Sequence, residues 1–128
     1  MIPWTNDELN IIGNADELQI AALRADGTLR KPVIIWVVRL GDELYVRSVN
    51  GRTSAWFRGV QVRHEGCIWA GGMDKDVTFV EEAGPGVNKQ IDAAYAAKYT
   101  CNPSSVEAIN SPTARTATIK FMPRLAGA

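Results

Sequence analysis

The sequence has little of the chemistry on which many catalytic and metal sites depend. Its 128 residues include one histidine, His64, and two cysteines, Cys67 and Cys101. No Cys-x-x-Cys pair occurs, so a structural zinc site lacks ligands and we expect no metal. A hydrolytic triad is disfavoured, because neither cysteine lies near the histidine in an informative motif. Cys67 lies in an apolar run and is expected in the core, which favours a reduced, cytoplasmic protein.

An excess of one charge is also missing. Fourteen Lys and Arg residues balance fourteen Asp and Glu residues, so no overall field attracts nucleic acid or an anionic membrane. The chain contains no run of eighteen apolar residues and does not begin with a basic region followed by an apolar stretch. We therefore expect neither a membrane span nor secretion. The 46% apolar and 22% charged residues are typical of a globular chain, and the length suits one domain, residues 1–128.

A short helix is expected near the N-terminus. Thr5 and Glu8 fit the capping box, which predicts a helix over residues 6–12. The following Gly13-Asn14 tolerates the left-handed conformation that often ends a helix. The helix should therefore stop at these two residues.

Strand signals follow this helix. Apolar residues at every second position predict strands over residues 17–24, where a helix is the alternative, and over residues 43–49. Asp26-Gly27 predicts a tight hairpin turn after the first of these. Pro32 opens the run V-I-I-W-V-V-R-L, which predicts one strand covered on nearly both faces.

The second half of the chain alternates helices and strands. Thr53 or Ser54 suits the N-cap of a short helix, and E-G-C-I-W-A-G-G with D-V-T-F-V-E-E predicts a strand pair that turns at residues 73–75. Apolar spacing of three and four from Val87 predicts a helix of about a dozen residues. A polar loop over residues 102–113 should then lead to a last strand, T-A-T-I-K-F-M-P.

The order of these elements favours a mainly β fold. Six strands, joined largely by tight hairpins, leave no room for the crossovers of a parallel sheet. A six-stranded antiparallel β-barrel with short helices at its ends satisfies this order and removes exposed strand edges.

The stretch R-S-V-N-G-R-T-S-A-W-F-R-G, residues 47–59, is the strongest candidate for a binding site. Forked guanidinium groups, hydroxyls and a helix start together favour phosphate or carboxylate, and Trp56 offers a flat face to a planar ring. The alternative is a polar loop that uses these groups in its own turns, before a tryptophan packed into the barrel end. The candidate ligand-binding residues are Arg47, Ser48, Asn50, Gly51, Arg52, Thr53, Ser54 and Trp56. A second possible anion contact is the helix start after Gly84-Pro85-Gly86, although it lacks the Gly-Lys-Ser/Thr of a P-loop.

Three stretches carry a resemblance to a known family. L-G-D-E-L-Y-V-R-S-V-N-G-R-T-S-A-W-F, I-W-A-G-G with D-V-T-F, and I-D-A-A-Y-A-A-K-Y resemble a small bacterial family of unknown function. That family is similar to the split β-barrel superfamily of pyridoxamine-phosphate-oxidase-like and deazaflavin-dependent nitroreductase-like proteins. The resemblance implies a split barrel, often dimeric, that binds FMN or a deazaflavin at a rim shared by two subunits. Deazaflavin-dependent relatives usually have His-Asn-Leu where this chain has Arg58-Gly59-Val60.

These observations leave three hypotheses for function. The first is an oxidoreductase that binds FMN or a deazaflavin, acts on a small molecule, and uses the cofactor for its redox chemistry. The second is a non-catalytic barrel that binds a small ligand or has a structural role, as a homodimer. The third is nucleic-acid binding through five arginines between residues 39 and 63 beside Trp56 and Phe57, against which the neutral overall charge argues. The sequence identifies no catalytic residue.

Overall fold

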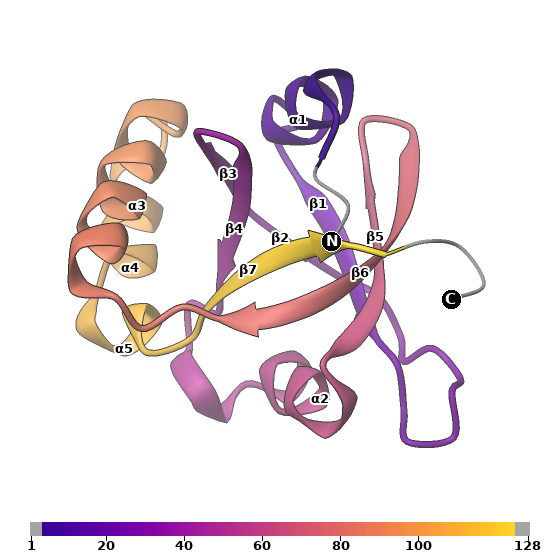
Figure 1. The fold of residues 1–128 in the computed structure, drawn as a ribbon. Helices are drawn as coiled ribbons and strands as arrows, with labels where there is room; N and C mark the ends of the chain where they lie inside the picture. Colours follow the sequence, from indigo (N-terminus) through magenta and orange to yellow (C-terminus); the bar gives the residue numbers. More distant parts are fainter. Residues whose placement is uncertain (1–3, 125–128) are drawn as a thin grey trace.

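The computed structural model describes residues 4–124, which form a seven-stranded antiparallel sheet curled into a nearly closed barrel (Figure 1). The strand order is β2-β1-β5-β6-β7-β4-β3. The strands are β1 (Leu18–Ala22), β2 (Val33–Ile35), β3 (Val37–Leu40), β4 (Glu43–Arg47), β5 (Glu65–Ala70), β6 (Met73–Glu81) and β7 (Thr118–Pro123). The predicted antiparallel barrel is confirmed, with seven strands among the described residues where six were expected.

The additional strand arises at Trp36. The apolar run after Pro32 was expected to form one strand, but it bends at Trp36 and pairs with different partners on either side. Val33 pairs with Ile20 of β1, whereas Val37 pairs with Val46 of β4. Because β2 and β3 are the two ends of the strand order, this single residue connects opposite edges of the sheet. The bend therefore brings the sheet round on itself and places Trp36 at the seam.

The first helix, α1 (Asn6–Gly13), has the predicted capping box. The Glu8 amide donates to Thr5 Oγ1 over 3.1 Å, and the Thr5 amide donates to Glu8 Oε1 over 2.9 Å. The helix stops at Gly13 and Asn14 as predicted, but Asn14 has a φ of −94°, so the ending is not the left-handed one that was expected. Gly13 is needed for a different reason, since a Cβ on it would lie 2.9 Å from the Cβ of Arg39.

Helices α2 (Ala55–Arg63) and α3 (Pro85–Lys98) confirm the two later helix predictions, and Ser54 is the N-cap of α2. The expected polar loop over residues 102–113 is wrong, because α4 (Pro103–Ile109) and the start of α5 (Pro112–Arg115) lie within it. Each of these short helices starts at a proline, whose fixed φ and missing N–H suit the first helical position. A 3-10 turn, Gly51–Thr53, precedes α2.

The hairpin between β5 and β6 turns two residues earlier than predicted. Gly71 and Gly72 have φ values of +59° and +82° and make the turn, while Met73 already pairs with Ala70 in the ladder. Positive φ suits glycine far better than Met73 or Asp74. The turn was therefore misplaced because its two glycines were assigned to the strand.

Two apolar clusters fill the structure. One occupies the barrel interior, where Leu44, Val46, Phe79 and Phe121 are almost fully buried. The other lies outside the barrel, where α3 and α4 pack against β3 and β4 (Figure 1). It contains Val38, Tyr45, Ile91, Tyr95, Tyr99 and Ile109. Strand β4 is consequently covered on both faces, which decides where its last residue, Arg47, can point.

Candidate functional site

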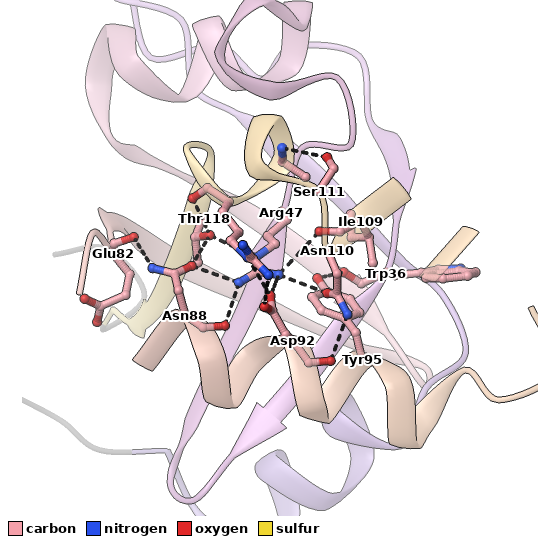
Figure 2. A network of polar contacts seen from close by, with 12 residues as sticks. Trp36, Arg47, Glu82, Asn88, Asp92, Tyr95, Ile109, Asn110, Ser111 and Thr118 are labelled. Atoms are coloured by element: carbon pink, nitrogen blue, oxygen red, sulfur yellow. Dashed lines mark hydrogen bonds and ion pairs between the residues drawn. The ribbon is translucent and has the colours of Figure 1, made fainter. Parts of the chain in front are cut away.

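Arg47 points into the second cluster, and its side chain has no exposed surface. Figure 2 shows the guanidinium surrounded by acceptors from β7, α3 and the end of α4. Nε donates to Thr118 Oγ1 over 3.0 Å. Nη1 donates to Asp92 Oδ1 (2.5 Å), to Asn110 Oδ1 (3.0 Å) and to the Ile109 carbonyl (3.3 Å). Nη2 donates to two oxygens of Asn88, the backbone carbonyl (3.0 Å) and the side-chain Oδ1 (2.8 Å). An arginine has five N–H groups, and these acceptors account for all of them. Arg47 therefore has no donor left for a ligand.

Asp92 neutralises this buried charge. Its carboxylate also accepts from Arg115, an exposed arginine at the end of α5. Burial acts to raise the pKa of Asp92, but the hydrogen bonds from Arg115 and Arg47 outweigh it and lower the pKa below its ordinary value. The carboxylate thus remains charged at neutral pH between two guanidinium groups.

Arg52 is also paired with a carboxylate, although 46% of its side chain is exposed. Nη1 donates to Glu81 Oε1 over 2.7 Å and to the Thr116 carbonyl over 2.8 Å. The hydrogen bond from Arg52 is the main reason why the pKa of Glu81 is lowered. The two arginines predicted to grip an anion are therefore each held by an acid of the protein itself.

The small polar residues of the loop form turns and caps. The hydroxyl oxygens of Ser48 and Ser54 are 2.7 Å apart, and Ser54 accepts from the Phe57 amide at the start of α2. The Thr53 hydroxyl donates to the Asn50 carbonyl. Gly51 has a φ of +76° and is buried against α5, so that a Cβ would lie 2.7 Å from Cγ2 of Thr113. These contacts tie the loop to itself, to α2 and to α5, and they leave Asn50 and Thr53 exposed.

A pocket of about 340 Å³ lies between the seam of the barrel and the start of α2. Trp36 at the seam and Trp56 on α2 line it, so two indoles face a shared space. Its other lining residues are Ile34, Ile35, Arg47, Val49, Ser105, Ala108 and Ile109. The walls are mostly apolar, and the volume falls within the range of small-molecule sites. Among the eight predicted residues, Arg47 and Trp56 reach this pocket.

The opposite wall of the pocket was not predicted from the sequence. Ile34, Ile35 and Trp36 were assigned to one buried strand, and Ser105 and Ala108 to a loop. Trp36 could have drawn attention as a large aromatic in the middle of an aliphatic run. Its ring stacks on that of Tyr99, with centroids 3.9 Å apart and an angle of 3° between the planes. This stack fixes the seam against the end of α3.

A second cavity, of about 370 Å³, is lined by Trp36 together with Tyr99 and residues of the loop before β1. Lys98 lines it, and its Nζ donates over 2.6 Å to the carbonyls of both Ala15 and Val37. Burial lowers the pKa of Lys98 to about 8, while the charge of Asp16 acts in the opposite direction. Burial also raises the pKa of the neighbouring Tyr99 to about 12. The Lys98 ammonium group therefore gives up its proton more readily than an exposed lysine does.

Residues 4–124 contain no group of three or more His, Cys, Asp or Glu side chains that could hold a metal ion. None of the helices within this range is both long and apolar enough to cross a membrane. His64 lies exposed at the end of α2, with a left-handed φ of +60°.

Comparisons with known proteins place this geometry in context. A family model described as "Uncharacterized protein conserved in bacteria (DUF2255)" matches residues 8–121. No curated protein matches the chain.

Several solved structures share the fold. A putative pyridoxamine 5'-phosphate oxidase from Listeria innocua is 14% identical, with 94% of this chain and 93% of that chain covered and a TM-score of 0.67. An F420-H2-dependent reductase (FDR-A) is 12% identical, with coverage of 84% and 94% and a TM-score of 0.62. A FAD-binding protein from Mesorhizobium loti is 14% identical, with coverage of 97% and 93% and a TM-score of 0.60. At these identities the likeness shows the split-barrel fold alone.

Proposed function

The chain belongs to the DUF2255 family, and from its split-barrel fold we propose that it binds a flavin or a deazaflavin and is an oxidoreductase for a small molecule. Proteins of the same fold include an F420-H2-dependent reductase and a FAD-binding protein. The observation that carries the proposal is the apolar pocket of about 340 Å³ lined by Trp36 and Trp56. When bound there, the cofactor would supply the redox chemistry, and the protein would supply position and electrostatics.

The residues around the pocket suit a planar ring. Indole faces and aliphatic side chains favour contact with flat, largely apolar groups. Trp36 and Trp56 would bind the ring system, while Ile34 and Val49 on the rim would cover its edge. This half of the site fits a flavin-type group well.

The predicted polar residues divide into two groups. We propose that Asn50 and Thr53, which are exposed in the loop before α2, contact the polar side of the ligand, while the Arg52 guanidinium stays paired with Glu81. The remaining members, Arg47, Ser48, Gly51 and Ser54, would act indirectly, because their contacts hold the loop in place. Contacts with the ligand and support of the loop can be separated by substitution.

We further propose that the protein is a homodimer whose interface lies beside this pocket. Ile34 is 59% exposed and Val49 is 44% exposed, and both belong to the pocket rim. Burying large apolar side chains such as these favours association. A second copy would cover the open side of the pocket.

A cytoplasmic location is proposed too, because Cys67 and Cys101 are free thiols.

A flavin panel tests the proposal. FMN, FAD, riboflavin and F420 would be titrated into the purified protein, with quenching of ligand fluorescence as the readout. Ala108→Phe adds a ring to the pocket wall from an exposed position on α4, and should weaken binding by at least about tenfold. Glu107→Phe, the neighbouring exposed residue, is the matched control and should have little effect.

The outcomes separate the hypotheses. If none of the four ligands binds, the proposed function is wrong. If Ala108→Phe leaves the affinity unchanged, the ligand binds somewhere other than this pocket. A cofactor that binds but, once chemically reduced, passes electrons to no small-molecule acceptor would favour the alternative of a non-catalytic ligand-binding barrel.

A further inference from the structure

Arg30, in the segment between β1 and β2, has an unsatisfied buried donor. Its Nε is the one buried side-chain nitrogen or oxygen atom in residues 4–124 without a hydrogen-bond partner. Nor does its guanidinium form an ion pair within this range, in contrast to Arg47 and Arg52. Buried polar atoms in folded proteins nearly always have a partner, so an acceptor outside the described chain, such as a water or a ligand oxygen, is expected at this nitrogen.

The surroundings of Arg30 are largely apolar. It lines a hollow of about 20 Å³, which is large enough for one water-sized group. The other lining residues are Ile20, Ala21, Ala22, Lys31, Trp56 and Val60. None of these carries a carboxylate, and Lys31 adds a second positive charge. The hollow therefore suits a single oxygen of an anionic group.

Gly59 on α2 makes room for the guanidinium. A Cβ at this position would lie 2.9 Å from both Cδ and Nε of Arg30. Any larger residue would push the side chain away from the helix. Because Gly59 has no side chain, the guanidinium of Arg30 can lie against α2. Its unpaired Nε is thereby kept beside the hollow that Trp56 and Val60 also line.

Trp56 connects this hollow with the larger pocket. The same indole lines the space at Arg30 and the 340 Å³ pocket that contains Trp36. A ligand with a ring against Trp56 and a phosphate on a short chain could occupy both spaces.

We propose that Arg30 is the anion-binding residue of this protein, and that its Nε–H donates to a phosphate oxygen of the ligand. This inference rests on the proposed function only for the identity of the ring that carries the phosphate. Lys31 strengthens the local positive potential, and Gly59 keeps the guanidinium in position. Arg52, the arginine prominent in the sequence, already has a carboxylate partner, whereas Arg30 forms no ion pair within residues 4–124 and also has a buried Nε without an acceptor.

The first test compares two ligands that differ in the phosphate. Equilibrium dissociation constants for FMN and riboflavin would be measured with the wild type and with Arg30→Gln. Loss of a charge-assisted hydrogen bond should weaken FMN by roughly ten- to a hundredfold and riboflavin by less than about threefold. Arg58→Gln removes an exposed charge from the same helix as Gly59, and should weaken FMN by less than about threefold. Equal effects of Arg30→Gln on both ligands, or no effect on either, would overturn the proposal.

A second test does not depend on flavin binding. Pyrophosphate would be titrated into the protein while the ¹⁵N–¹H resonance of each arginine Nε is followed. We expect the Arg30 resonance, assigned by its loss in Arg30→Gln, to shift with pyrophosphate and not with chloride at equal ionic strength. Gly59→Ala should reduce the shift, because its Cβ displaces the guanidinium. If pyrophosphate does not shift the Arg30 resonance, water alone occupies the hollow. Arg30 would then not be an anion-binding residue, even if flavins bind to the protein.

Discussion

Arg47 Nη1 donates to Asp92 Oδ1 over 2.5 Å, and this ion pair joins the end of β4 to the middle of α3. Asn88, Asn110 and Thr118 complete the shell around the same guanidinium (Figure 2). Because Arg47 and Ile109 also line the pocket, the network sets the position of the pocket floor. The buried charge of Arg47 thus has a structural role next to the proposed ligand pocket.

Asp92→Ala should destabilise the fold strongly. It leaves the fully buried Arg47 without a counter-charge, and breaking one side of a buried ion pair typically costs about 3–5 kcal/mol. Urea unfolding followed by circular dichroism would measure the change in the free energy of unfolding. Asp42→Ala, at an exposed turn, is the matched control and should change it by less than about 0.5 kcal/mol. A loss no larger than the control's would show that Arg47 is not held as described.

Acid should remove the same contribution from the wild type. The pKa of Asp92 in the folded protein lies below its ordinary value of 3.8. The stability that its charge provides is therefore present above pH 3.8 and is lost as the pH falls through the lower, folded-state value. The difference in stability between wild type and Asp92→Asn should shrink in that acidic range. A difference that does not change with pH would contradict the assignment.

Gly51→Ala should be more harmful than Gly41→Ala. Both glycines have positive φ, +76° and +61°, so both substitutions carry a similar backbone penalty of about 1–2 kcal/mol. At Gly51 the new Cβ also meets Cγ2 of Thr113 at 2.7 Å, whereas at Gly41 it meets nothing within 4 Å. Crowding of this kind adds about 1–3 kcal/mol. Thermal unfolding of the two variants gives the comparison, and equal losses would mean that the loop does not pack on α5.

Lys98 should make the protein more stable at mildly alkaline pH. Its pKa is lowered from 10.5 to about 8 on folding, so between these values the unfolded chain binds a proton that the folded state lacks. Raising the pH from 8 to 10 therefore favours the folded state. Above pH 10 the raised pKa of Tyr99, about 12, acts in the opposite direction. Unfolding free energies for Lys98→Met should lack the rise between pH 8 and 10, and those for Lys89→Met, an exposed control on α3, should keep it.

Ile34→Asp should shift the proposed dimer to a monomer. The substitution places a charge at the most exposed large apolar side chain of the pocket rim. Size-exclusion chromatography with light scattering would measure the molecular mass. Val62→Asp is the control, because Val62 is 53% exposed on α2 and does not line the pocket. A wild type that runs as a monomer at all concentrations, or a dimer unaffected by Ile34→Asp, would contradict the interface.

Features that depend on near neighbours could be predicted from the sequence. The Thr5–Glu8 capping box, the Ser54 cap and the alternation in β4 each involve residues a few positions apart. The two short helices after α3 were missed because their prolines were taken as loop residues rather than as helix starts. The break at Trp36 was missed because an apolar run does not reveal which strand each half will pair with.

The sequence by itself determined the class of fold, since periodicity, caps and turns are local and together allow an antiparallel barrel. Only the tertiary structure decided which arginine side chains are already paired with a carboxylate of the protein. Arg47 meets Asp92 45 positions away, and Arg52 meets Glu81 29 positions away. Arg30 lies over Gly59, and among residues 4–124 it forms no ion pair and its Nε has no acceptor. Such ion pairs form between segments that are distant in the sequence and are brought together by folding. The local composition of the chain therefore cannot show which arginine will meet which acid.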